Sequence, residues 1–160
     1  MMGDSSFSQS EAVRQNWSEI QRDIESIAGD YESEGWTTIQ VSTGDVTPLV
    51  EDSDQSAILD ILVPDDELVE IERIAEDAGF DGFDVYEHTM KSDVFLIVVL
   101  MSSRADSAVI YPAYYQMVEA EEMLEMADAE GTVWTRFRNL ADDKEVVVEQ
   151  TPSTLFCPKA

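Results

Sequence analysis

Acidic residues are spread along the whole chain, between well-formed apolar runs, and this distribution limits the fold more than any other feature of the sequence. The 160 residues include 35 Asp and Glu against 9 Lys and Arg, which gives a formal net charge of −26. Carboxylates are almost never fully buried without a partner, so these acids must form the surface, and the apolar runs between them must form the core. Apolar residues make up 44 % of the chain, enough for the core of one globular domain and too many for a disordered chain.

A negative surface this uniform indicates a protein that works in concentrated salt. At ordinary ionic strength the charges would repel one another and destabilise a small folded domain. In roughly molar salt the Debye length falls to about 3 Å, so neighbouring surface carboxylates hardly interact. We therefore expect an intracellular protein of an extreme halophile. The alternative is an acidic protein that binds a basic partner, although such proteins usually concentrate their charge in one patch.

Charge and hydropathy also argue against several kinds of partner. Nucleic-acid binding needs a basic footprint, and the nearest approach to one is Arg136 with Arg138. The most apolar run, VFLIVVLM at 94–101, is far shorter than the roughly 20 residues of a membrane-spanning helix. The N-terminal stretch lacks the basic start and apolar centre of a signal peptide, and the single cysteine, Cys157, allows no internal disulfide. We expect a cytoplasmic protein that binds neither nucleic acid nor membrane.

Hydrophobic periodicity predicts a single α+β domain over residues 1–160, with a mostly antiparallel sheet and three helices in the order α-β-β-α-β-β-β-α-β-β. Helical spacing marks an N-terminal helical segment at 1–33, a helix from Asp65 to a stop at Gly79, and a helix over 112–130 that stops at Gly131. Strands are expected at 36–46, 57–64, 83–90, 94–101, 107–111, 132–140 and 145–150, with a polar connection at 47–56 and an irregular tail at 151–160.

The stretch VEAEEMLEMADAEG at 118–131 holds six carboxylates and no cation, which raises the question of a metal or acid–base site. On the predicted helix the acids fall opposite an apolar stripe formed by Ala113, Met117, Ala120, Leu124 and Ala127. A carboxylate metal site between helices needs inward-pointing Glu, usually in a Glu-x-x-His motif, and that motif is absent. We interpret these acids as a solvated face. With no zinc spacing, P-loop or dinucleotide fingerprint in the sequence, neither a metal nor a cofactor is expected.

The only histidine, His88, restricts the catalytic possibilities. In FDVYEHTM, strand alternation places Asp84, Tyr86 and His88 on one face, where they could serve as an acid, a phenol and a base. The alternative interpretation is the polar outer face of a half-buried strand.

A second candidate set lies in TVWTRFRNL, where Trp134, Arg136 and Arg138 share one strand face. Two arginines beside an indole could hold an anionic ligand or an acidic group of a partner. The alternative is an intramolecular ion pair with an acid on a neighbouring strand, which contributes little by itself.

Four parts of the chain form a recognisable pattern: EGWTTIQVSTGDV; FDVYEHT before VFLIVVL; AVIYPAYYQMVEAEEMLEMADAEGTVWTRFRNL; and LFCP near the end. Together they resemble a family of small conserved haloarchaeal proteins of unknown function. The resemblance runs over roughly residues 34–158 and consists of a pattern of strands, turns and a helix. It implies a cytoplasmic protein of a salt-accumulating archaeon, and it brings no activity and no catalytic residues.

These observations lead to two hypotheses about function. The first is a non-enzymatic α+β domain that acts by binding, either as a homodimer or with an unidentified protein partner, using some of its many aromatic residues at the interface. The second is a small-ligand-binding protein or an enzyme that uses the strand face of Asp84, Tyr86 and His88, which would require those groups to line one concave pocket.

Overall fold

The computed structural model describes residues 2–51, 55–90 and 93–153, with the backbone alone described for residues 2–16 and 88–90. It is one α+β domain with three helices, so the expected fold class is confirmed. The elements in chain order are α1 (Met2–Ser33), β1 (Thr37–Gln40), β2 (Val46–Glu51), β3 (Ser56–Leu62), α2 (Asp65–Asp77), β4 (Gly82–Met90), β5 (Asp93–Ser102), β6 (Ser107–Gln116), a 3₁₀ turn η1 (Met117–Ala120), α3 (Glu121–Glu130), β7 (Val133–Arg138) and β8 (Glu145–Gln150).

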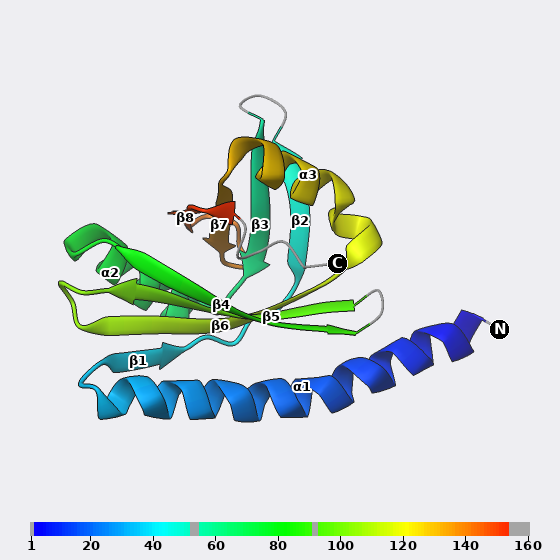
Figure 1. Ribbon diagram of the computed structural model, residues 1–160, viewed down its shortest axis with the longest axis horizontal. Coiled ribbons are helices and arrows are strands. Elements are labelled where there is room, and N and C mark those ends of the chain that lie inside the picture. The colour runs from blue at the N-terminus through cyan, green and yellow to red at the C-terminus, as the bar shows by residue number, and fades with distance from the viewer. Residues whose placement is uncertain (1, 52–54, 91–92, 154–160) are drawn as a thin grey trace.

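The strands form two four-stranded sheets. Sheet A has the order β1-β6-β5-β4 and sheet B the order β2-β3-β7-β8. The strands expected at 83–90, 94–101 and 107–111 form an antiparallel meander, β4–β5–β6, and those expected at 132–140 and 145–150 form an antiparallel hairpin, β7–β8. Pairing is parallel only between β1 and β6 and between β3 and β7 among the described strands. In Figure 1, β2 and β3 stand upright above the horizontal strands of sheet A, and α1 runs along the other side of sheet A.

The main core lies between the facing surfaces of the two sheets. Period-two alternation supplies it, because every second residue of β5, β6, β3 and β7 points inward; examples are Leu96, Tyr111, Leu59 and Phe137, all at most 1 % exposed. The buried residues of α2 and α3 belong to the same core. Both helices therefore close the sides of the space between the sheets and leave the outer face of sheet B uncovered.

A second, smaller core lies between α1 and the outer face of sheet A. The predicted stripe on the first helix provides one side of it, with Ile20 and Ile24 each 2 % exposed and Trp17 half-buried. Phe95 of β5 and Ile110 of β6 provide the other side. The helix stays in place because its described apolar side chains gather on this stripe, while its described acids are exposed.

Residues 47–56 were expected to be a polar connection, and this is wrong for their first half. Val46–Glu51 form strand β2, which pairs with β3 antiparallel through Val46↔Ile61 to Glu51↔Ser56. The segment is short, acidic at its end and contains Pro48, which together conceal a strand. Because β2 lies at the edge of sheet B, a proline is tolerated there.

The third helix starts later than the predicted residue 112. Strand β6 continues to Gln116, because β5 is long enough to pair with it as far as Asp93↔Gln116. Pro112 does not end the strand. Because β1 has already ended beside Ile110, the missing N–H of Pro112 costs no hydrogen bond to β1. Ala113 therefore lies in a strand. Met117 and Ala120 of the predicted stripe lie in η1, so α3 itself carries only Leu124 and Ala127 of it. The predicted end and solvated face are present: α3 ends at Gly131 with a φ of 75°, and all six acids at 119–130 are exposed.

Candidate functional site

The predicted Asp84, Tyr86 and His88 set falls on β4, on the face of sheet A that also carries α1. Asp84 pairs with Val99 and Tyr86 with Ile97, both residues of the α1-facing side. Tyr86 is 42 % exposed, and its pKa is raised by burial and then by Asp84 and Asp30. His88 pairs with Phe95 through the backbone, and its side chain lies outside the described residues. Neither Asp84 nor Tyr86 lines the cavity described below, and a catalytic role for the set stays a prediction.

Arg136 and Arg138 converge on one buried carboxylate. Asp60 of β3 is 5 % exposed and is the buried acid among the residues whose side chains the structure describes. Arg136 Nε lies 2.9 Å from Asp60 Oδ1, and Arg138 Nε lies 2.7 Å from Oδ2. The pKa of each guanidinium is raised, first by its hydrogen bond to Asp60. The intramolecular pairing considered from the sequence is thus present, and it explains how an acid can sit in the middle of a sheet.

Asp60, Arg136 and Arg138 belong to the outer face of sheet B, here called the sheet-B face. By strand register it comprises Thr47, Leu49 and Glu51 of β2; Ile58, Asp60 and Leu62 of β3; Trp134, Arg136 and Arg138 of β7; and Glu145, Val147 and Glu149 of β8. Apolar groups remain accessible on it, with Trp134 half-buried and Val147 47 % exposed. The described helices do not cover this face, because their buried residues belong to the two cores.

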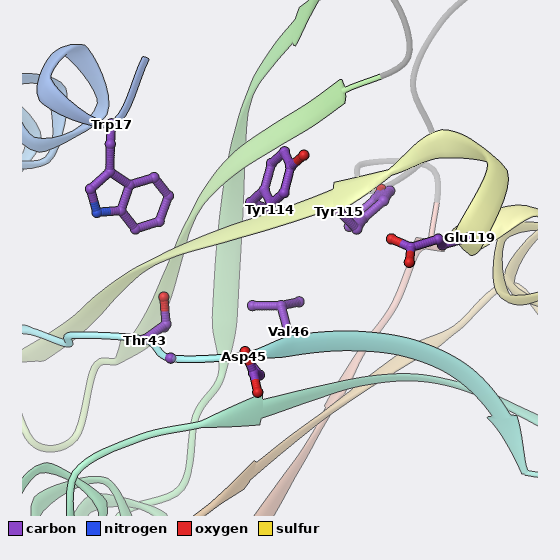
Figure 2. A pocket seen from close by; sticks show the side chains of 8 residues that line it. Trp17, Thr43, Asp45, Val46, Tyr114, Tyr115 and Glu119 are labelled. Carbon is purple, nitrogen blue, oxygen red and sulfur yellow. The ribbon is translucent and has the colours of Figure 1, made fainter. Parts of the chain in front are cut away.

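A cavity of about 360 Å³ opens where β6 runs beyond its neighbour β1. Its lining comes from four segments of the chain: Trp17 of α1; Thr43, Gly44, Asp45 and Val46 around the start of β2; Tyr114 and Tyr115 of β6; and Glu119 of η1. Figure 2 shows the indole of Trp17 and the ring of Tyr114 on one side of the space, with Asp45 and Glu119 at other points of its rim. Asp45 and Glu119 are exposed, whereas Trp17 and Tyr114 are half-buried.

The floor of this cavity is held by hydrogen bonds between segments distant in sequence. Thr43 Oγ1 donates to the carbonyl of Pro112 at 3.0 Å, and the Gly44 N–H donates to the carbonyl of Leu62 at 2.7 Å. Tyr114 Oη donates to Asp93 Oδ1 at 3.0 Å, and burial together with this bond raises the pKa of the phenol to about 12. The site is therefore preorganised, and Tyr114 is a neutral phenol at physiological pH.

A polar cluster inside the main core has a structural role. Tyr111 Oη donates to Thr135 Oγ1 at 3.3 Å, Thr135 Oγ1 donates to Gln150 Oε1 at 2.6 Å, and Gln150 Nε2 donates to Tyr111 Oη at 3.2 Å. All three side chains are fully buried. This closed ring joins β6 of sheet A to β7 and β8 of sheet B, and burial raises the pKa of Tyr111 to about 12.

In the described part of the chain, no group of three or more His, Cys, Asp or Glu residues is placed to hold a metal ion. Over the same residues, none of the helices combines the length and the apolar character needed to cross a membrane. Cys157 and the rest of the tail beyond Ser153 lie outside the described residues.

Sequence patterns did not indicate the cavity. Trp17 and Tyr114 stood out only as aromatic residues suited to a core or an interface, and Glu119 was one acid among many. The residues are up to a hundred positions apart, so no spacing rule connects them. The one feature of the sequence that pointed to the cavity was the adjacent aromatic pair Tyr114–Tyr115, because successive side chains of a strand point to opposite faces.

Comparison with known proteins gives a family and no activity. A family of unknown function (DUF7529) matches residues 3–158. No curated protein and no solved structure matches the chain. Because the matched region covers almost the whole sequence, the protein belongs to this family of unknown function, DUF7529.

Proposed function

We propose that this protein is a non-enzymatic interaction protein of the cytoplasm of a salt-accumulating archaeon, and that it works as a homodimer formed through the sheet-B face. The observation that carries the proposal is the sheet-B face, which none of the described helices covers and on which Val147 is 47 % exposed. A sheet face that buries one side in a core and leaves apolar groups on the other side is a suitable surface for association.

Charge on the sheet-B face favours a second copy of this chain as the occupant. Its two positive groups, Arg136 and Arg138, lie in β7 and share the single charge of Asp60, which leaves this part of the face positive. The negative groups Glu145 and Glu149 lie in the adjacent edge strand β8, and Glu51 lies on the opposite edge strand β2. In a two-fold interface the same patch meets itself. An axis between β7 and β8 places each positive column opposite the negative column of the other copy, with Val147 near the axis.

Such a dimer also fits the charge of the chain. Two copies bring together twice the net charge of −26, and at low ionic strength this repulsion opposes association. In roughly molar salt the screening length of about 3 Å removes the long-range repulsion and leaves apolar contact and short ion pairs. We therefore expect the dimer to strengthen as potassium chloride rises.

Sedimentation equilibrium across a potassium chloride series tests the proposal. The wild-type protein is expected to shift from monomer to dimer between about 0.5 M and about 3 M salt. Val147→Lys places a positive charge in β8, opposite the arginine column of the other copy, and should weaken the dimer at least tenfold. Val118→Lys is the matched control, because Val118 is 68 % exposed on η1, whose buried Ala120 belongs to the main core and not to the sheet-B face. A strict monomer at every salt concentration, or equal effects of the two substitutions, would refute the homodimer.

A further inference from the structure

We propose that the cavity between α1, the start of β2 and the end of β6 binds a small organic cation with a quaternary ammonium group. The supporting arrangement is an aromatic wall from Trp17 and Tyr114 facing a rim that carries the carboxylates of Asp45 and Glu119. This site lies beside α1 and β6, and the β2 residue that lines it, Val46, packs against the main core on the side of β2 opposite the sheet-B face, so its test is independent of the homodimer.

The aromatic wall is a continuous, rigid row. The rings of Trp17 and Phe95 have centroids 6.5 Å apart, and those of Phe95 and Tyr114 lie 4.8 Å apart at 38°. Phe95 is 1 % exposed and supports the two outer rings from below. The face of an indole or phenol attracts a cation through its quadrupole, most strongly when water is excluded. Because Tyr114 is held by Asp93, its ring cannot turn away when a ligand enters.

The charge of the lining selects for a positive ligand. Asp45 and Glu119 are the charged residues of its described lining, and among the residues whose side chains the structure describes no Lys or Arg lines it. An anion would meet two carboxylates without a compensating donor. A neutral polyol could use the carboxylates as acceptors but would gain nothing from their charge. Only a cation is attracted by both the acids and the rings.

The size and chemistry of the cavity favour an organic cation over a metal ion. A volume of about 360 Å³ falls in the range of about 300–1,000 Å³ typical of small-molecule sites. Calcium needs six to eight oxygen ligands and magnesium a near-ideal octahedron, whereas two exposed carboxylates at separate points of the rim supply neither. Methyl groups on nitrogen, by contrast, pack against aromatic rings while the charge remains delocalised over their surface.

Isothermal titration calorimetry at a fixed concentration of about 1 M potassium chloride provides the first test. The probes are choline, its uncharged isostere 3,3-dimethyl-1-butanol, and glycine betaine, which adds a carboxylate. Choline should bind at least about fivefold more tightly than the isostere, as one cation–π contact requires. Glycine betaine should bind more weakly than choline, because its carboxylate approaches Asp45 and Glu119. Equal binding of choline and the neutral isostere, or no binding of choline, would overturn the proposal.

Variants then locate the site. Trp17→Leu keeps the apolar contact of α1 with sheet A but removes the indole, and should weaken choline binding about tenfold. If this change loosens α1, the exposed pair Asp45→Asn and Glu119→Gln still tests the site and should weaken choline binding about three- to tenfold. The control pair Glu70→Gln and Asp77→Asn changes the charge equally on the solvent side of α2 and should have no effect. An equal loss in the two charge pairs would show general electrostatics rather than this cavity, and would overturn the assignment.

Discussion

Replacing the buried hydroxyls and amide of the Tyr111, Thr135 and Gln150 ring tests how the two sheets are held together. Tyr111→Phe keeps the aromatic ring against Phe137, whose centroid lies 5.0 Å away at 83°. It removes the oxygen that accepts from Gln150 Nε2 at 3.2 Å and donates to Thr135 at 3.3 Å. Because the site is fully buried, water cannot replace that acceptor without opening the core.

The expected magnitudes follow from how many polar groups each change leaves without a partner. Tyr111→Phe leaves the amide donor of Gln150 unpaired, which costs about 1–3 kcal/mol of unfolding free energy. Thr135→Val removes the hydroxyl bonded to both other members and leaves one donor and one acceptor unpaired, so its cost should be about twice as large. The triple change Tyr111→Phe, Thr135→Val and Gln150→Met leaves no buried polar group of the ring unpaired. It should cost less than Thr135→Val alone.

Urea unfolding followed by circular dichroism, at a constant potassium chloride concentration of about 2 M so that surface charge stays screened, gives the free energies. For a chain of this length each kcal/mol corresponds to about 2–4 °C in Tm, so differential scanning calorimetry provides a second measurement. Strict additivity, with the triple variant as unstable as the sum of the single changes, would refute the closed ring and indicate three independent hydrogen bonds.

Three further predictions concern charge and pH. The Tm of the wild-type protein should rise as potassium chloride rises from dilute to multimolar, because the net charge of −26 is then screened; a level or falling curve would contradict the salt interpretation. Asp60→Asn should lower the unfolding free energy by about 1–3 kcal/mol, because both arginines lose a charged acceptor, whereas Asp106→Asn in an exposed turn should have almost no effect. Tyr111 and Tyr114 have pKa values raised from 10.0 to about 12, so between these values the folded state keeps protons that the unfolded state releases. Stability is therefore complete below pH 10 and falls as pH rises towards 12; Tyr111→Phe should make this fall shallower, and an unchanged slope would argue against the titration of Tyr111.

Strong local periodicity made most of the fold predictable. The stripe of α1, the acidic start and glycine stop of α2, and the long apolar run of β5 each mark one element without help from the rest of the chain. The two departures arise where pairing partners decide the outcome. Val46–Glu51 become a strand because β3 is beside them, and β6 extends past Pro112 because β5 is ten residues long. Neither partner can be identified from the local sequence.

The candidate sites were predictable only where one element carries them. Trp134, Arg136 and Arg138 share a face by simple alternation, so the sheet-B face was accessible from the sequence, although its buried acid Asp60 was not. The cavity forms because α1 packs across sheet A and because β1 ends beside Ile110 while β6 continues, which brings Trp17 near Tyr114. Such long-range placement has no period or motif to reveal it.

Screening in concentrated salt gives the two proposed sites opposite responses, and this difference can be measured on one sample. In concentrated salt, surface charges interact only within about 3 Å, so recognition depends on contact between aromatic rings and apolar surfaces. Trp17, Tyr114 and Val147 supply partly exposed groups of this kind. Association through the sheet-B face should strengthen with potassium chloride, because repulsion between acidic copies disappears and apolar burial remains. Choline binding should weaken modestly over the same range, because potassium ions screen and occupy Asp45 and Glu119 while the aromatic wall is unaffected. Sedimentation and calorimetry over the same salt series should therefore give slopes of opposite sign. Parallel slopes would mean that one force governs both processes, and would contradict the separation of the two sites.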